Sequence, residues 1–298
     1  MKKLIISTIS LVALFFGRAE QAAAQVSPLT SQYFTNTYLS NPAMAGQRKG
    51  LSAFAAYLQQ FSGIPGAPET QNVSANYGFS KVGVGIIVNN ETAGLQRQTR
   101  VVGTFAYHVE LNNSSKVHFG LSMGFLNQRI DVASLIGNPN DPNVGQYNGR
   151  DTYLDGDFGV AFTTNKLTLE AAIPNLKSFF KKDVVKLADV ATFYSAIAYR
   201  FSLVGDSDAS NIEVEPKVAF RGVQGMDNVW DGGAQLSFAG RQILLTGMYH
   251  SNESATFGLG MNFRKKYHFS GLYTTNTGTL NNYINGGFEL NVGVMLDK

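Results

Sequence analysis

The chain has 298 residues, of which 44% are hydrophobic and only 15% charged, with a net charge of +3 and no cysteine. The lack of cysteine excludes disulfides, thiolate catalysis, Cys-based metal sites and a lipid-modified N-terminal cysteine. The near-neutral charge gives no indication of nucleic-acid binding.

The N-terminus has the pattern of a Sec signal peptide. Lys2 and Lys3 precede an uncharged apolar stretch, Leu4 to Phe16, and Ala22-Ala23-Ala24 follows it. This stretch is too short to span a bilayer as a helix. We therefore expect residues 1–24 to be a signal peptide cleaved after Ala24, with an uncleaved anchor as the alternative.

From residue 50 onward, short segments alternate between apolar and polar side chains. In the clearest one, Val214, Pro216 and Val218 alternate with Glu215, Lys217 and Arg221. A strand with one charged face does not fit a sandwich core, but it fits a barrel wall between lipid and water. The prediction is an all-β fold, a single antiparallel transmembrane β-barrel of about 14 strands over residues 50–298. The expected strands are 51–60, 70–79, 81–90, 97–110, 115–129, 153–164, 166–173, 190–203, 211–221, 230–239, 241–250, 254–263, 266–275 and 283–296.

The connections between these segments differ in length on the two sides. Every second one is short, as at Ser80 and Asn165, whereas others run from Ile130 to Thr152 and from Pro174 to Asp189. Short periplasmic turns and long external loops are typical of outer-membrane barrels. Residues 25–49 lack alternation, and we expect them to form either a periplasmic arm or a partial plug in the barrel.

Candidate catalytic and metal-ligating residues are sparse. The four histidines lie in expected strands, and His250-Ser251 is the single neighbouring Ser–His pair. Two adjacent residues hardly constrain catalytic geometry, so we expect no enzyme activity. The run from Asn138 to Asn143, followed by Asp151, Asp155 and Asp157, holds oxygen ligands without the spacing of a calcium loop, and turn formation is the favoured interpretation. No cofactor or metal is expected.

Several charged residues occupy the polar faces of the expected strands. A mixture of both signs favours ion pairs that fill the lumen, and a path for a solute is the alternative. These candidate lumen residues are Arg200, Glu213, Glu215, Lys217, Arg221 and Glu289. Gly83 and Gly85 alternate within a strand, where glycine allows close backbone approach, curvature or space for a bulky neighbour.

Two sequence elements carry a resemblance to a known family. The first is Asn41-Pro42-Ala43-Met44-Ala45-Gly46, and the second is Pro65-Gly66-Ala67-Pro68-Glu69-Thr70. Together with Phe119-Gly120-Leu121-Ser122 and Asp157-Phe158-Gly159-Val160, they resemble the PorP/SprF family. The resemblance spans essentially the whole mature chain, and its motif residues are Asn41, Pro42, Ala43, Ala45, Gly46, Pro65, Pro68 and Thr70.

This resemblance implies an outer-membrane protein of the type IX secretion system of Bacteroidota. It implies a role in export or surface attachment of proteins with C-terminal sorting domains, of the gliding-adhesin type. It also implies partners among other secretion components, including a periplasmic protein linked to peptidoglycan.

We expect a non-enzymatic barrel that docks a secreted partner at its external loops. The candidate docking residues lie in the two longest loops and are Gln146, Tyr147, Phe179, Phe180, Lys181 and Lys182. The alternative is a passive or gated channel for a small apolar solute.

Overall fold

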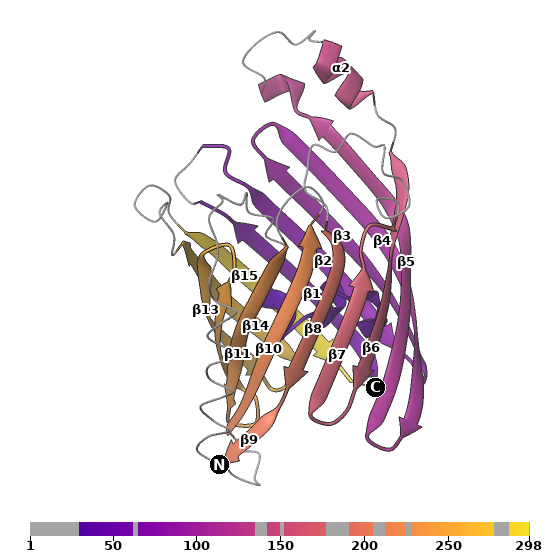
Figure 1. Cartoon of the computed structure of the whole chain (residues 1–298), viewed down its shortest axis with the longest axis vertical. Coiled ribbons are helices and arrows are strands. Elements are labelled where there is room, and N and C mark those ends of the chain that lie inside the picture. The colour runs from indigo at the N-terminus through magenta and orange to yellow at the C-terminus, as the bar shows by residue number, and fades with distance from the viewer. Residues whose placement is uncertain are drawn as a thin grey trace, which may run out of the picture.

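The computed structural model describes residues 30–61, 65–134, 142–149, 152–176, 191–204, 212–223, 228–276 and 286–297. They form a closed antiparallel β-barrel (Figure 1). The strands are β1 (Gly50–Gln59), β2 (Glu69–Gly78), β3 (Val82–Ala93), β4 (Gln96–Asn112), β5 (Ser115–Ile130), β6 (Tyr153–Thr163), β7 (Leu167–Ile173), β8 (Ala191–Tyr199), β9 (Phe201–Val204), β10 (Ile212–Val223), β11 (Val229–Phe238), β12 (Ile243–His250), β13 (Ser254–Phe263), β14 (Tyr267–Asn276) and β15 (Gly287–Leu296). The predicted signal peptide lies outside the described residues.

The strands pair with their neighbours in chain order, and the pairing of β1 with β15 closes the barrel. β1 pairs with both β2 and β15, and β10 pairs with both β8 and β11. β8 and β9 both pair with β10, so they are one barrel strand interrupted at Arg200. The wall therefore contains 14 strands, which confirms the predicted fold class.

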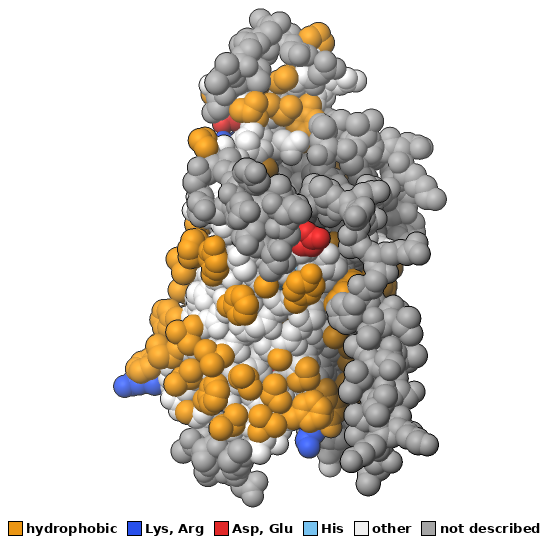
Figure 2. Space-filling model, turned by 60° about the vertical axis from the view of Figure 1, so that its left-hand side comes forward, with side chains coloured by type: hydrophobic (Ala, Val, Ile, Leu, Met, Phe, Trp, Pro, Cys, Tyr) orange, Lys and Arg blue, Asp and Glu red, His pale blue; other side chains and the backbone are white. Residues whose placement is uncertain are grey.

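Side chains alternate between the lipid-facing and lumenal surfaces of the wall. On β5, Phe119 and Met123 are 44% and 66% exposed, whereas His118 and Ser122 between and beside them are 1% and 2% exposed. Hydrophobic side chains gather over the lower barrel wall in Figure 2, with few charged side chains among them. An outer face of this kind is stable in hydrocarbon, where a charged side chain is costly.

The two ends of the barrel differ as expected from the connection lengths. At one end the turns are short, as at residues 79–81, 164–166 and 264–266. We assign this end to the periplasm by the general rule for such barrels. At the other end, the sequence predicted a plain loop between β5 and β6, but this connection contains helix α2 (Pro142–Asn148), seen at the top of Figure 1. Within the described part of the chain, no helix is long and apolar enough to cross a bilayer.

Candidate functional site

Residues 30–46, which we call the plug segment, lie inside the barrel. They form three short 3₁₀ turns, Thr30–Tyr33, Thr37–Leu39 and Pro42–Met44. Tyr33 and Tyr38 are 2% and 3% exposed, because inward-facing side chains of the wall surround them. The Tyr33 ring packs at a tilt against Tyr194 of β8, with the ring centroids 5.8 Å apart.

The first half of the plug segment makes polar contacts with distant strands. Four of its side chains donate hydrogen bonds to the wall. Gln32 donates to Glu289 (2.9 Å) and to Asn291, and Tyr33 donates to Asp231 (3.0 Å). Asn36 donates to Ser74 (2.9 Å), and Tyr38 donates to Thr104 (2.7 Å). The acceptors belong to β15, β11, β2 and β4, so the segment crosses the lumen instead of following one side of the wall. Each contact gives a buried polar group a partner, which avoids the cost of an unpaired group.

The second half contains the Asn-Pro-Ala-Met-Ala-Gly element, residues 41–46, and Asn41 organises it. The Asn41 Oδ1 accepts a hydrogen bond from the Ala43 amide at 3.0 Å, and Pro42 follows at the first position of the 3₁₀ turn. This is the usual arrangement of a cap residue and a proline at a helix start. The Asn41 Nδ2 donates to the Val160 carbonyl of β6 at 3.1 Å. One buried side chain thus shapes the motif and ties it to the wall.

Residues 41–46 rest on glycines of the wall. A Cβ at Gly120 would meet the backbone of Pro42 and Ala43, and one at Gly83 would meet the Ala45 carbonyl. At Gly159 it would meet Asn41 Oδ1. This explains the glycines in strands β3, β5 and β6, since any side chain there would occupy the space of the motif backbone.

Gly46 ends the motif in a left-handed conformation, with φ of +67°. Its amide donates to Asn76 Oδ1 of β2 at 3.0 Å. A Cβ on Gly46 would meet the backbone of Gly83 and Gly78. Glycine is therefore required here both by the backbone angle and by the contact.

The second motif element, residues 65–70, lies at the opposite end of β1 and β2. The Pro68 carbonyl accepts from the Gln60 amide at 2.9 Å, and the Gly66 carbonyl accepts from the Gly94 amide at 2.9 Å. Thr70 begins the buried face of β2 and is 7% exposed. These contacts fasten the β1–β2 loop to the β3–β4 turn at the external rim.

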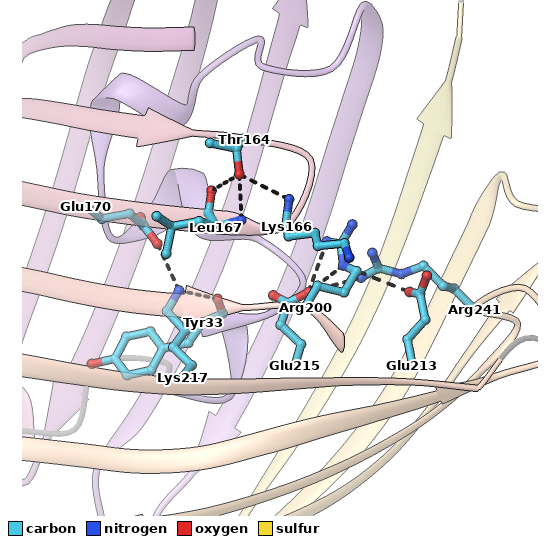
Figure 3. Close-up of polar contacts among 10 residues, drawn as sticks. All are labelled: Tyr33, Thr164, Lys166, Leu167, Glu170, Arg200, Glu213, Glu215, Lys217 and Arg241. Atoms are coloured by element: carbon cyan, nitrogen blue, oxygen red, sulfur yellow. Dashed lines mark hydrogen bonds and ion pairs between the residues drawn. The ribbon is translucent and has the colours of Figure 1, made fainter. Parts of the chain in front are cut away.

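The predicted lumen charges are paired with other groups. Lys217 Nζ lies between Glu170 Oε1 of β7 at 2.9 Å and the carbonyl of Tyr33 at 2.7 Å (Figure 3). The Lys217 and Glu170 side chains are 2% and 0% exposed. This ion pair therefore joins the plug segment to two strands of the wall.

A second group of charges lies nearer the periplasmic end, as Figure 3 also shows. Arg200 contacts Glu215 at 2.9 Å and Glu213 at 3.9 Å, and Arg241 reaches Glu215 at 3.9 Å. These side chains are about one-sixth to one-third exposed. The group joins the break between β8 and β9 to the β11–β12 turn.

A third group centres on Asp231, which is fully buried. It accepts from Arg221, from Tyr33, and from the ring of His250 at 2.7 Å. The second ring nitrogen of His250 contacts Thr256 at 2.8 Å, and Ser251 Oγ accepts from the Trp230 amide. The two ring nitrogens of His250 thus have partners other than Ser251, so these residues do not form a Ser–His pair.

Sequence reasoning missed several members of the lumen. Arg100 of β4 contacts Asp157 at 2.7 Å and Asp155 at 3.7 Å, both on β6. Glu170 was also missed as the partner of Lys217. All of these residues lie on the polar face of their strands, so the alternation of the sequence indicated that they face the lumen. Which charges form ion pairs depends on which strands lie close together across the lumen, and the alternation does not show that.

Comparison with known proteins establishes the family. A family model described as type IX secretion system membrane protein PorP/SprF matches residues 22–294. The chain belongs to this family. The resemblance carried by the Asn41–Gly46 and Pro65–Thr70 elements is thereby confirmed, and the protein is an outer-membrane component of that secretion system. Among curated proteins, none matches the chain.

Solved outer-membrane barrels are similar to this PorP/SprF protein at low sequence identity. Omp33 of Acinetobacter baumannii superposes with a TM-score of 0.51 at 8% identity, covering 84% of this chain and 100% of that chain. The toluene transporter TbuX of Ralstonia pickettii gives a TM-score of 0.47 at 10% identity, covering 92% and 94% of the two chains. The likeness to Omp33 supports the barrel fold alone.

The candidate docking residues are only partly described. Gln146 on helix α2 is exposed, whereas Tyr147 beside it is 6% exposed and turned into the structure. Phe179, Phe180, Lys181 and Lys182 lie outside the described residues, as does most of the Asn138–Asn143 run. Gln146 is thus the docking candidate that the described residues leave accessible.

The periplasmic end of the PorP/SprF barrel carries many exposed basic side chains. They are Arg48, Lys49, Lys81, Lys166, Arg264, Lys265 and Lys266. Arg48 pairs with Asp297 through a 2.7 Å hydrogen bond, which keeps the pKa of the Asp297 carboxyl below its usual range. The pair joins the start of β1 to the end of β15, where the barrel closes.

Proposed function

We propose that this protein is a non-enzymatic docking component of the type IX secretion system that supports export or surface attachment of proteins with C-terminal sorting domains. The observation that carries the proposal is the family match over residues 22–294. The described geometry supports it, because the barrel is a rigid frame with its longest connections at one end, where loops are free to vary and to bind partners.

The contents of the lumen also support a docking role. The plug segment crosses the barrel, and Arg200, Lys217, Arg221 and Glu289 of the lumen pair with other charged side chains or with the plug. A channel for a small apolar solute needs a continuous apolar path, and these buried ion pairs count against one. The part of the barrel that remains available for recognition is its two ends.

The external end offers helix α2 as the site for the secreted partner. Gln146 is exposed on this helix, above the rim formed by β4 and β5. The periplasmic end offers the exposed Lys and Arg side chains of the short turns, which fit an acidic surface on a periplasmic component. The two ends would thus contact different partners.

Site-specific crosslinking in cells tests this arrangement. A photoreactive residue in place of Gln146 should capture a large surface protein that bears a C-terminal sorting domain. The same residue in place of Asn165, which is exposed in the β6–β7 turn, should capture a periplasmic component instead. A third position on the lipid-facing wall, Met123, is the control and should capture neither.

Deletion of the gene is the complementary test. Loss of one or more sorting-domain proteins from the cell surface is expected, with restoration by the full-length gene. Intact secretion and surface attachment in the deletion strain, together with an absence of adducts at Gln146, would overturn the proposal.

A further inference from the structure

The motif lies on a continuous row of small residues in the wall. The strand register pairs Gly78 with Gly83, Gly83 with Ala106, Ala106 with Gly120, Gly120 with Gly159, and Gly159 with Ala172. The row therefore crosses six adjacent strands, β2 to β7, along one line of paired residues. At β8 it ends abruptly, because the next residue is Tyr194.

The motif and the row match in length. Asn41 contacts Gly159 on β6, and Gly46 contacts Gly83 on β3, so the motif spans three strand intervals. At about 4.8 Å for each interval this distance is about 14 Å, or about 2.9 Å for each of the five residue steps. That rise lies between a 3₁₀ turn, about 2.0 Å, and an extended strand, about 3.3 Å. A short 3₁₀ turn followed by extended backbone therefore fits the row.

Each residue of the motif contacts the wall or is buried against it. Asn41 reaches the Val160 carbonyl, and Pro42 and Ala43 press their backbone on Gly120. Ala45 is fully buried in a cluster with Ala106, and Gly46 has a positive φ against Gly83. Met44, in contrast, uses its side chain to pack on Ala161. The row thus fits a peptide with small residues on its contact positions, while the Met44 side chain packs beside the row on Ala161.

The wall forms its strand ladder without the motif. All the residues of the row pair with neighbouring strands, and the motif adds bonds from Asn41 to the Val160 carbonyl and from Gly46 to the Asn76 side chain. The motif is therefore added to a complete barrel, as a ligand is added to its site.

From these contacts we propose that the small-residue row of β2 to β7 is a peptide-binding site, for which residues 41–46 are the resident and displaceable ligand. The bound ligand holds the plug segment across the lumen. The site takes a peptide with small residues at its contact positions, an asparagine at one end and glycine at the other. This assignment concerns the barrel itself and does not depend on the proposed secretion role.

The test uses the full-length protein with a specific protease site inserted between Arg48 and Lys49, which are both exposed. After folding and cleavage, the plug segment is no longer covalently attached. The probe is a fluorescent synthetic peptide of residues 30–48, and its binding is followed by fluorescence anisotropy in detergent micelles. We expect saturable exchange into the cleaved protein and none into the uncleaved protein.

Two variants and one altered peptide decide the location of the site. Gly120→Val puts a side chain where the motif backbone lies, and should weaken binding about 10- to 100-fold. Gly103→Val is the matched control on β4, since Gly103 is exposed on the outer face and a Cβ there meets only the Met123 carbonyl oxygen at an ordinary 3.9 Å, and the affinity of this variant for the peptide should be unchanged. A peptide with Gly46→Val should fail to compete, and this arm leaves the barrel unaltered if Gly120→Val does not fold.

The proposal is overturned if the labelled peptide does not exchange into the cleaved protein, or if it binds cleaved and uncleaved protein alike. Equal affinity of the Gly120→Val and Gly103→Val proteins would also overturn it. So would equal competition by the native and the Gly46→Val peptides.

Discussion

Lys217 illustrates how a single buried charge is maintained in the lumen. Its ammonium group has two oxygen partners, Glu170 of the wall and the Tyr33 carbonyl of the plug segment. Charged groups so far from water are stable only when they are paired and hydrogen-bonded. Removal of Lys217 or Glu170 leaves the other charge buried without its partner, so the stability of single and double variants tests whether the two residues are paired in the lumen.

Lys217→Met should destabilise the folded barrel by about 3–5 kcal/mol, because Glu170 is left as an uncompensated buried charge. Urea unfolding in phospholipid vesicles measures the change in free energy of unfolding. The double variant with Glu170→Leu should recover most of the loss. Lys166→Met, on an exposed turn, is the control and should change stability by less than about 0.5 kcal/mol. A loss in the double variant as large as in Lys217→Met would contradict the pairing.

Asn41 is the corresponding residue of the plug segment. Asn41→Ala removes the acceptor for the Ala43 amide and the donor to Val160, and should destabilise the motif by about 1–3 kcal/mol. Hydrogen exchange by mass spectrometry should show faster exchange of the amides in residues 42–46, with β5 and β6 unchanged. Unaltered exchange in residues 42–46 would show that the side chain does not hold the motif.

At the scale of elements, the short turns combine basic side chains with a strained backbone. Arg264 and Lys265, between β13 and β14, have φ of +52° and +57°. Two consecutive positive φ values are typical of the tight hairpin turn that favours Asn-Gly. Basic residues at these positions cost stability, which is consistent with a role for their charge at the periplasmic rim.

Replacement of Arg264-Lys265 by Asn-Gly should therefore stabilise the barrel by about 1 kcal/mol, because the turn backbone is no longer strained. Urea unfolding measures this gain. If the basic rim binds a periplasmic component, the same variant should give weaker capture from position 165 despite its greater stability. A stabilised protein with full capture would show that these two charges are not needed for binding.

At the scale of the whole molecule, the bilayer decides which face of each strand tolerates charge. Leu259 lies at the middle of β13 and is 61% exposed on the outer wall, whereas Leu111 is 59% exposed beside a periplasmic turn. Leu259→Arg should cost about 2–4 kcal/mol in vesicles, and Leu111→Arg about 0–1 kcal/mol, because the cost of a charge falls toward the interface. Equal costs at the two positions would contradict the proposed placement in the membrane.

The wall was predictable from the sequence because the face on which each side chain lies depends only on its position along its own strand. Alternation along β5 and β10 places each side chain on the lipid or lumenal face without knowledge of the rest of the fold. Helix α2 was not expected, since Pro142–Asn148 is short and lies in a connection rich in turn formers. On β1, the structure turns Phe54 inward at 7% exposure and Tyr57 outward at 36%.

The candidate site was predictable in part. The lumenal phase of Arg200, Lys217 and Arg221 followed from alternation, but their partners did not, because Glu170 and Asp231 come from strands whose register is set by the closed sheet. Gly83 could be marked as a point of close approach, yet nothing in a strand pattern names the approaching backbone as Ala45.

The sequence by itself determined the barrel, its strand number, the face of most side chains and the family motifs, since each depends on periodicity or on short contiguous elements. Only the tertiary structure decided that the motif segment crosses the lumen and rests on a row of glycine and alanine from six strands. That row exists only when β2 to β7 are in register, because its residues are far apart in the chain and become neighbours through the hydrogen-bonded ladder.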